Sequence, residues 1–337
     1  MKRRGLTLAH ARASREGMVP YRKIVLIAGL VSLTCAGMLV AARAQSFTVL
    51  RLTVGIVAPQ GATLSTDRYE PFRAALASEL GTSVDITLFR TGQDLIDAAE
   101  HRRIDYGVYT ASTYAATWRQ CGCIEPLAVP RSVDGSAGVR SILLVRNDSG
   151  YKTPSDLSGK ILAAPPAPSI AGHLVPFSEL AAAGSDPAHL FARIDPAAGP
   201  EAAVTALLDR SADAAIAWST LEGEPADGYD RGTLHDLVAR HILGMHAIRI
   251  IWKSALIPNG PHAVNSDLAP AVKARLREFL IDLADTHPDA YDAIEPTFGG
   301  GFVPIGHAAF LPLLRLVTPA GSDPTQPLVL GTTAKKS

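Results

Sequence analysis

A possible ligand-binding turn lies at residues 166–176, which read PAPSIAGHLVP. Pro168 and Ser169 mark the expected start of a helix, and the first backbone N–H groups of a helix have no partner within it. Such N–H groups can hold an anion. Because a helix start with a purely structural role has the same sequence, the pattern alone leaves open whether this turn binds a ligand.

The remaining polar residues form no recognisable catalytic or metal-binding motif. The sequence contains no phosphate-binding loop, HExxH motif or GxSxG motif. His235, His241 and His246 lack the i, i+4 spacing of metal ligands on a helix. Ser169 has no base close to it in the sequence, although folding can bring one near. We therefore expect a binding protein and no enzyme, with no cofactor and no bound metal.

Two neighbouring cysteines, Cys121 and Cys123, occur in the stretch QCGCIEP. In an oxidising compartment they can form a disulfide, and two thiolates can also bind a metal or take part in redox chemistry. A structural metal site needs about four ligands, and the sequence has no second cysteine pair. We expect a small local disulfide or two inert thiols.

The charges are distributed unevenly along the chain. The full sequence has 32 basic and 32 acidic side chains, but residues 1–44 hold eight of the basic ones and a single acidic one. The remainder therefore has a net charge of about −7. A nucleic-acid-binding protein needs a basic surface that displaces counterions. We expect no nucleic-acid partner.

The N-terminus has the pattern of an export signal. Arg22 and Lys23 precede an apolar run at 24–42, and the sequence Ala-Arg-Ala at 42–44 offers a small-x-small cleavage site before Gln45. We expect a cleaved signal peptide at 1–44, with Met18 as a possible true start, and a periplasmic protein. The alternative is an uncleaved membrane anchor, because the apolar run is long enough to span a thinned bilayer.

From residue 50 onward, predicted strands and helices alternate as in an α/β protein. Three predicted strands and the helices between them form one β-α-β-α-β unit within about 60 residues. The Gly-rich stretch FGGGF at 298–302 is interpreted as a loop. The predicted strands are 50–57, 83–89, 104–110, 138–150, 160–165 and 246–254, and a helix is predicted over 169–182.

These elements divide into two α/β halves, and the first half is built from an early and a late segment. Two chain crossings, near residues 140 and 255, would form a hinge with a ligand cleft between two lobes. Ligands bind beyond the carboxyl ends of parallel strands, which here end near Thr110, Pro166 and Arg90. The expected boundaries are 45–140 with 255–320 for lobe 1, 141–254 for lobe 2 and 321–337 for a flexible tail.

Several longer stretches resemble a known family in their order and spacing. These stretches include RRIDYGVYTASTY (102–114), ILLVRNDSGYKTPSDLSGK (142–160), SIAGHLVP (169–176) and GFVPIGHAAFLPLL (301–314). Over most of residues 50–316 the chain is similar to the phosphonate/phosphite/phosphate group of periplasmic solute-binding proteins, which serve ABC importers. The resemblance implies a two-lobed type II periplasmic-binding-protein fold.

The resemblance also implies which residues form the ligand site. The family's Ser-Thr-Ser-Gly turn, whose hydroxyl and N–H groups hold the anionic head of the ligand, corresponds here to Ser169, Ile170, Ala171 and Gly172. One hydroxyl is kept and two are lost. Each charge-assisted hydrogen bond contributes about 1.5–3 kcal/mol, so a phosphonate would bind much less tightly. A less charged or larger ligand, such as a carboxylate or a partly hydrophobic organophosphorus compound, is therefore a hypothesis.

Other positions of the implied site are partly changed. In the family, the position of Gly260 often carries an acidic residue, and the position of Pro200 usually carries a histidine. Arg90 is interpreted either as a substitute bidentate grip on an anion or as a solvated loop arginine. The expected ligand-binding residues are Tyr109, Thr110, Ser169, Ile170, Ala171, Gly172, Arg90 and Glu201.

The sequence therefore predicts an exported solute-binding protein of an ABC importer. Its ligand would be a small oxoanion, phosphonate-like or a drifted relative, bound in an interlobe cleft. The expected partner is an ABC permease in the inner membrane, and the protein itself is expected to be a monomer. The alternative is a periplasmic sensor that passes its ligand state to a membrane receptor or kinase.

Overall fold

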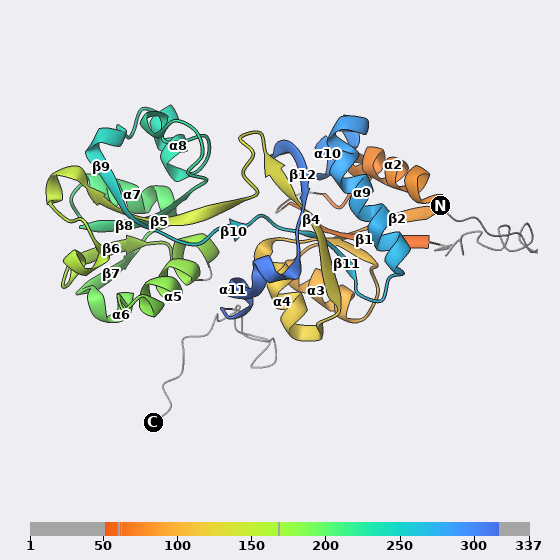
Figure 1. Ribbon diagram of the computed structural model, residues 1–337, viewed down its shortest axis with the longest axis horizontal. Helices are drawn as coiled ribbons and strands as arrows, with labels where there is room; N and C mark the ends of the chain where they lie inside the picture. Colours follow the sequence, from red (N-terminus) through yellow and green to blue (C-terminus); the bar gives the residue numbers. More distant parts are fainter. Residues whose placement is uncertain (1–50, 60, 62, 168, 317–337) are drawn as a thin grey trace, which may run out of the picture. The chain divides into compact units, whose positions relative to one another are not determined.

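The computed structural model describes residues 51–59, 61, 63–167 and 169–316. Within them the chain forms two six-stranded sheets (Figure 1). The predicted signal peptide at 1–44 and the predicted tail at 321–337 lie outside the described residues. No helix in the described part of the chain is long and apolar enough to cross a membrane.

The first sheet has the strand order β12-β4-β11-β3-β1-β2. Strand β1, next to the edge strand β2, pairs in parallel with β2 and β3. Antiparallel pairs then join β3 to β11, β11 to β4 and β4 to β12. The strands are β1 (Arg51–Val57), β2 (Ser83–Phe89), β3 (Tyr106–Val108), β4 (Ile124–Ser132), β11 (His262–Asn265) and β12 (Gly299–Pro304).

Helices cover both faces of the first sheet, which explains why β1 is buried at most of its positions. On one face, Phe72, Leu276 and Tyr291 pack with Leu52 and Val54 of β1. On the other, Leu95, Tyr114 and Phe310 belong to a second buried cluster. The helices of the first face are α2 (Glu70–Leu80), α9 (Pro270–Thr286) and α10 (Pro288–Ile294), and those of the second are α3 (Gly92–Glu100), α4 (Ala111–Cys121) and α11 (Leu311–Leu314).

The second sheet has the order β10-β5-β8-β6-β7, with β9 paired to β5. Strand β6 runs parallel to β7 and β8, whereas β5 runs antiparallel to β8 and β9. Its strands are β5 (Gly138–Arg146), β6 (Ile161–Ala164), β7 (Arg193–Pro196), β8 (Ala214–Ser219), β9 (Ile248–Lys253) and β10 (Ile257–Pro258). Its helices are α5 (Val175–Ala182), α6 (Pro187–Leu190), α7 (Pro200–Leu208) and α8 (Thr233–Ala239).

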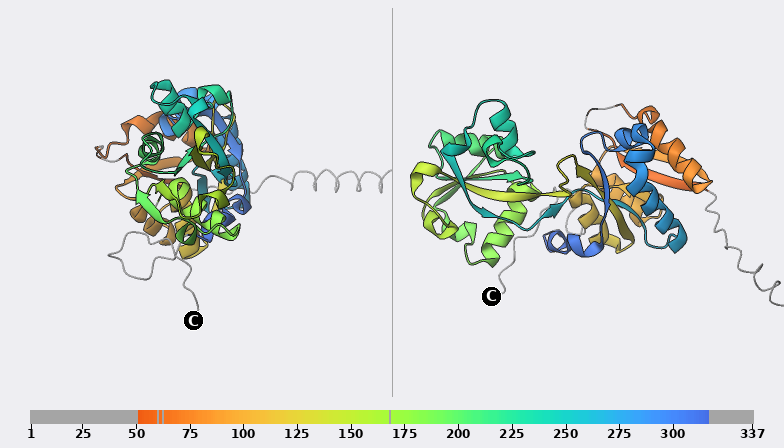
Figure 2. Two further views of the ribbon diagram at one scale, coloured as in Figure 1. Left: turned by 90° about the vertical axis from the view of Figure 1, so that its left-hand side faces the viewer. Right: turned by 45° about the horizontal axis from the view of Figure 1, so that its top comes forward.

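Two segments of the chain, which pair with each other, connect the two sheets (Figure 2). The chain leaves the first sheet between β4 and β5 and returns to it between β10 and β11. Strands β5 and β10 are antiparallel neighbours, with Val139 opposite Ile257. A Cβ atom at Gly138 would lie 2.3 Å from the carbonyl oxygen of Ile257, so this close pairing requires glycine.

Four predicted elements differ from the structure. The predicted strand 138–150 ends at Arg146, and Asn147–Ser149 form a 3-10 helix. The predicted helix 169–182 begins as a π-helix at Ile170–Leu174 and becomes the α-helix α5 only at Val175. The predicted strand 246–254 begins with a 3-10 turn, Met245–Ala247, before β9. The stretch 298–302, interpreted as a loop, enters the edge strand β12 at Gly299. At an edge strand Gly residues are tolerated, and Gly300 is required because its Cβ would lie 2.2 Å from the Ser132 carbonyl oxygen.

The remaining short elements are 3-10 helices at Asp67–Tyr69, Asn147–Ser149, Pro154–Leu157, Pro225–Asp227 and His307–Phe310.

Candidate functional site

A cavity of about 390 Å³ lies at the carboxyl ends of β1 and β3, where ligands bind in open α/β sheets. We call it the Glu295 cavity. Its walls combine apolar strand ends, the start of α4, two aromatic side chains and one carboxylate. It is lined by Ile56, Val57, Gly92, Val108, Tyr109, Thr110, Ala111, Thr113, Pro130, Gly260, Glu295 and Phe298.

The start of α4 presents hydroxyl and N–H groups to this cavity. The Thr110 Oγ1 atom accepts a hydrogen bond from the Thr113 N–H at 3.1 Å, and the Thr113 Oγ1 atom accepts one from the Thr110 N–H at 2.8 Å. This reciprocal cap satisfies two groups and leaves the N–H groups of Ala111 and Ser112 without a partner among the described residues. The helix start can therefore hold the anionic part of a ligand.

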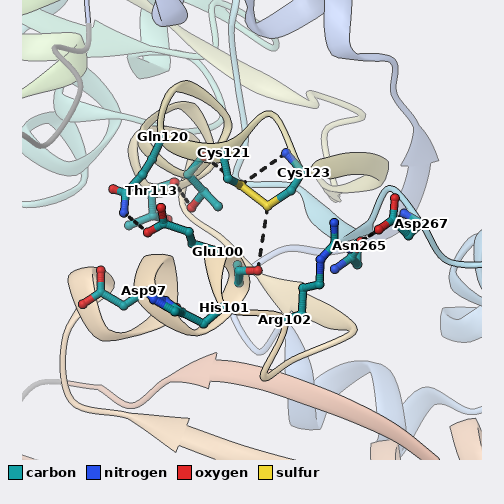
Figure 3. The surroundings of a disulfide bond; sticks show 12 residues. Asp97, Glu100, His101, Arg102, Thr113, Gln120, Cys121, Cys123, Asn265 and Asp267 are labelled. Atoms are coloured by element: carbon teal, nitrogen blue, oxygen red, sulfur yellow. Dashed lines mark hydrogen bonds and ion pairs between the residues drawn. A yellow bond between two sulfur atoms is a disulfide. The ribbon is translucent and has the colours of Figure 1, made fainter.

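The other end of α4 is fixed by a disulfide between Cys121 and Cys123 (Figure 3). Cys121 is the last residue of the helix, and Gly122 turns the chain in a left-handed conformation at φ 59°. The Cys123 sulfur lies 3.8 Å from the carbonyl oxygen of Ala99 at the end of α3. Of the possibilities that the sequence left open for these two cysteines, the structure contains the local disulfide.

Tyr109 forms a buried wall of the Glu295 cavity. Its ring folds back over Gly107, where a Cβ atom would lie 2.5 Å from the ring, and meets Tyr114 edge-on with 6.4 Å between ring centroids. Only 4% of Tyr109 is exposed. Burial, with a smaller contribution from Tyr114, raises the pKa of Tyr109 well above its usual value, so the phenol keeps its proton.

Gly260 closes the same cavity by backbone contact. A Cβ atom at this position would lie 2.0 Å from the Tyr109 carbonyl oxygen and 2.8 Å from the Thr110 Cα atom. The resemblance implies an acidic residue here, but the structure leaves no space for any side chain. The carboxylate of this cavity comes instead from Glu295, which the sequence did not indicate.

Glu295 belongs to a chain of three buried polar groups. The Glu295 Oε1 atom lies 2.8 Å from Nε2 of His262, and Nδ1 of His262 is hydrogen-bonded to the hydroxyl of Tyr106. His262 is fully buried, and 12% of the Glu295 side chain is exposed. Burial and then the negative charge of Glu295 raise the pKa of Tyr106 well above its usual value.

A second cavity, of about 370 Å³, lies at the carboxyl ends of β7 and β8 in the second sheet. We call it the Trp218 cavity. It contains Glu201, in the first turn of α7, whose carboxylate pairs with Arg240 at 2.5 Å. Both side chains of that pair are about half exposed. It is lined by Ala198, Gly199, Pro200, Glu201, Ala202, Trp218, Thr233 and Asp236.

The predicted turn at Ser169–Gly172 lines neither cavity. The Ser169 Oγ atom accepts a hydrogen bond from the Gly172 N–H at 3.1 Å, so this hydroxyl and this N–H already satisfy each other. The N–H groups of Ile170 and Ala171 have no partner among the described residues. The side chains of Ile170 and Ala171 pack against the buried cluster that also contains Tyr109.

Arg90 is exposed, and the described residues offer it no hydrogen bond or ion pair. It lies between β2 and Thr91, which caps α3 in a reciprocal bond with Asp94. Gly92, two residues further on, lines the Glu295 cavity, but Arg90 does not. The structure thus brings Tyr109 and Thr110 together in one cavity and places Glu201 in another.

The sequence did not single out Thr113, Phe298, Trp218 or Asp236, all of which line the cavities. Within the described residues, no three His, Cys, Asp or Glu side chains are grouped as metal ligands.

Two sheets with mixed strands, joined by two crossings, define the two-lobed α/β fold of type II periplasmic binding proteins. Residues 54–310 match the family described as "ABC transporter, phosphonate, periplasmic substrate-binding protein". The match covers more than half of the chain, so the protein belongs to this family of periplasmic substrate-binding proteins of ABC transporters.

Solved structures show the same fold at low sequence identity. XAC2383 from Xanthomonas citri bound to ATP is 21% identical, with 77% of this chain and 93% of that chain covered and a TM-score of 0.54. The form of XAC2383 bound to chloride ion has the same identity and coverage and a TM-score of 0.52. Transferrin 1 from Manduca sexta is 13% identical, with 77% of this chain and 44% of that chain covered and a TM-score of 0.53.

Proposed function

We propose that this protein is a monomeric periplasmic solute-binding protein that delivers a small oxoanion-type ligand to an ABC permease. The observation that carries the proposal is the Glu295 cavity, which joins the carboxyl ends of β1 and β3 to the free N–H groups at the start of α4. Membership of the family supports the transport role.

In this proposal two lobes close over the ligand. Residues 45–140 with 255–320 form lobe 1 and 141–254 form lobe 2, so the Glu295 cavity belongs to lobe 1 and the Trp218 cavity to lobe 2. Tyr109 and Thr110 contact the ligand from lobe 1. The turn at Ser169–Gly172 and Glu201 contribute from lobe 2, and Arg90 reaches in from the rim of lobe 1.

The ligand is proposed to be a drifted relative of a phosphonate. Ile170 and Ala171 present apolar side chains that pack against a buried cluster, where the family's turn offers hydroxyl groups. The free N–H groups of these two residues can still bind an anion, but the hydroxyl groups that would also donate hydrogen bonds to it are missing. A less charged or larger ligand, such as a carboxylate or a partly hydrophobic organophosphorus compound, would lose less binding free energy.

The test is a thermal-shift and calorimetric screen of the protein lacking residues 1–44 against phosphate, phosphite, alkylphosphonates, sulfonates and small carboxylates. A ligand at 100 times its Kd adds about 2.7 kcal/mol to the free energy of unfolding and raises the melting temperature. Submicromolar binding of methylphosphonate or phosphite would contradict the proposal that the site no longer favours such ligands. Lack of binding by the whole panel would contradict the oxoanion class.

Two variants test the site itself. Tyr109→Ala and Ser169→Ala should each weaken a confirmed ligand by at least tenfold, and Ser178→Ala, an exposed serine of α5, is the matched control. Unchanged affinity in both site variants would place the ligand elsewhere. A gene pair for a permease and an ATPase beside this gene supports import, whereas a histidine kinase there supports the sensor alternative.

A further inference from the structure

Arg231 lies in the segment that follows β8 of the second sheet, and its backbone is fixed there. Its carbonyl oxygen accepts hydrogen bonds from the Thr220 N–H group at 3.1 Å and from the Ser219 hydroxyl at 3.4 Å. Gly232 has a φ of 123°, and a Cβ atom on it would lie 2.7 Å from the Ser219 Cα atom. The base of the Arg231 side chain is therefore held against the carboxyl end of β8.

The Arg231 side chain contacts the part of the chain that forms the first sheet. Its Nη1 atom donates to the Ser132 hydroxyl at 2.6 Å, and its guanidinium carbon lies 4.7 Å from the centroid of the Phe298 ring. Ser132 is the last residue of β4, and Phe298 precedes β12 and lines the Glu295 cavity. The side chain thus joins the end of β8 to a wall of that cavity, outside the two crossings.

The two residues that Arg231 contacts belong to one edge of the first sheet. Gly299, next to Phe298, pairs with Ser132 where β12 meets β4. A Cβ atom at Gly300 would lie 2.2 Å from the Ser132 carbonyl oxygen, so the two strands approach closely here. Ser132 itself is buried. The guanidinium therefore contacts a well-packed strand edge.

The two contacts of the Arg231 guanidinium are of a kind that can hold parts of a protein together. A hydrogen bond from a charged donor is stronger than one between neutral groups, and a cation over an aromatic ring adds a further attraction. Among the described residues no carboxylate forms an ion pair with Arg231. A single charge-assisted hydrogen bond can change an equilibrium by about tenfold or more.

We propose that Arg231 is a latch between the two sheets, which keeps the end of β8 against the Phe298 wall of the Glu295 cavity. Arg231 is a positioning residue, because it acts on the ligand site through Phe298. When the latch breaks, the two parts of the chain can rotate about the paired crossings, and the cavity wall is released. This inference goes beyond the proposed function and does not depend on the identity of the ligand.

A different prediction follows if the paired crossings alone fix the arrangement of the two sheets. The Arg231 side chain could then be removed without moving one sheet relative to the other. Arg231→Ala removes both contacts, and Ser132→Ala removes the hydrogen-bond acceptor on the other side. Arg249→Ala is the matched control, since Arg249 donates to the Asn147 Oδ1 atom at 2.6 Å and to the Tyr151 carbonyl oxygen at 3.2 Å within the second-sheet part.

The experiment measures the distance between the two parts by pulsed electron paramagnetic resonance, with no ligand added. The protein lacks residues 1–44, as in the ligand screen. Spin labels are attached through Ala188→Cys in α6 and Asp285→Cys in α9, both at exposed positions. Cys121 and Cys123 are joined in a disulfide and take up no label. Circular dichroism checks that each variant is folded.

We expect one dominant distance in the labelled protein that has no further substitution. Arg231→Ala should lower the ratio of this population to all others by about tenfold or more. Ser132→Ala should act in the same direction, and Arg249→Ala should leave the distribution unchanged.

An unchanged distribution in Arg231→Ala overturns the inference, and so does a broad distribution before any latch residue is replaced. An equal change in Arg249→Ala also overturns it, because the effect would then not be specific to the contact between the sheets. If Arg231→Ala does not fold, Ser132→Ala decides the question, and an unchanged distribution in that variant overturns the inference. The ligand screen is independent of these outcomes, so the proposed function and the latch can fail separately.

Discussion

The Glu295 cavity and the Trp218 cavity have the same origin and different walls. Each lies at the carboxyl ends of parallel strands, beside the start of a helix, and each contains a glutamate. In the Glu295 cavity the carboxylate is hydrogen-bonded to the fully buried His262, which is in turn hydrogen-bonded to the buried Tyr106. In the Trp218 cavity, Glu201 is held by Arg240 on an open surface, and both side chains are about half exposed.

This difference shows what the fold supplies and what the side chains add. Parallel strands followed by helices create a hollow in each sheet, whatever residues line it. A buried network fixes a charge in one position, whereas a solvated ion pair contributes little and can rearrange. We therefore expect the wall of the Glu295 cavity to be the more rigid of the two and that of the Trp218 cavity to be the more adaptable.

Among the variants that test this difference between the cavities, His262→Leu should have the largest effect on the free energy of unfolding. The substitution leaves the Tyr106 hydroxyl and the Glu295 carboxylate without their partner, and each buried unsatisfied group costs about 1–3 kcal/mol. The free energy of unfolding, measured by urea denaturation, should fall by about 2–6 kcal/mol. In the other cavity, Glu201→Gln breaks an exposed ion pair and should cost less than about 1 kcal/mol. Similar losses in the two variants would remove the contrast.

The next effect concerns one glycine from the lining of each cavity, Gly260 and Gly199. A Cβ atom at Gly260 would lie 2.0 Å from the Tyr109 carbonyl oxygen, whereas none of the neighbouring atoms lies within 4 Å of a Cβ at Gly199. Gly260→Ala should therefore lower the free energy of unfolding by about 1–3 kcal/mol, the usual cost of overpacking. Gly199→Ala, whose backbone is extended at φ 178°, should change it by less than about 0.5 kcal/mol. Equal stabilities of the two variants would show that the Gly260 backbone can move aside.

A smaller effect is expected from removing the disulfide at the end of α4. The bond joins residues separated by two positions, so it restricts only a short loop of the unfolded chain. The loop-entropy relation gives a contribution of about 1–2 kcal/mol for so short a loop. Replacing both Cys121 and Cys123 by serine should lower the free energy of unfolding by that amount, and ligand affinity at the start of α4 should not change. A large loss of affinity would mean that the disulfide positions the cavity wall.

The sequence predicts the elements whose signals are local. The strands predicted at 50–57 and 83–89 each depend on a few neighbouring residues, and the structure forms β1 and β2 there. The family motifs, read together, also predict the type II fold. The π-helical start at Ile170 was missed because a distant residue helps to fix it, since the Ser141 hydroxyl donates to the Ala171 carbonyl oxygen at 2.6 Å.

The candidate site was predicted only in part for the same reason. Tyr109 and Thr110 are adjacent in the sequence and follow a predicted strand, so the rule for parallel sheets finds them. Tyr106 and His262 are 156 positions apart, and His262 and Glu295 are 33 apart. No periodicity or motif links residues at such separations. Only the pairing of β11 with β3 brings the histidine to the tyrosine.

The smallest effect at neutral pH is expected for Tyr109→Phe, which tests whether Tyr109 acts as a buried wall. Its hydroxyl has no hydrogen-bond partner among the described residues, so the variant should match the wild-type stability at pH 8. Burial raises the pKa of Tyr109 in the folded protein, so above pH 10 the unfolded chain releases this proton while the folded chain retains it. The wild-type protein should therefore lose up to about 1.4 kcal/mol more per pH unit than the variant above pH 10. Urea denaturation at pH 8 and pH 11 measures this difference, and parallel losses would mean that the ring opens to water from the cavity.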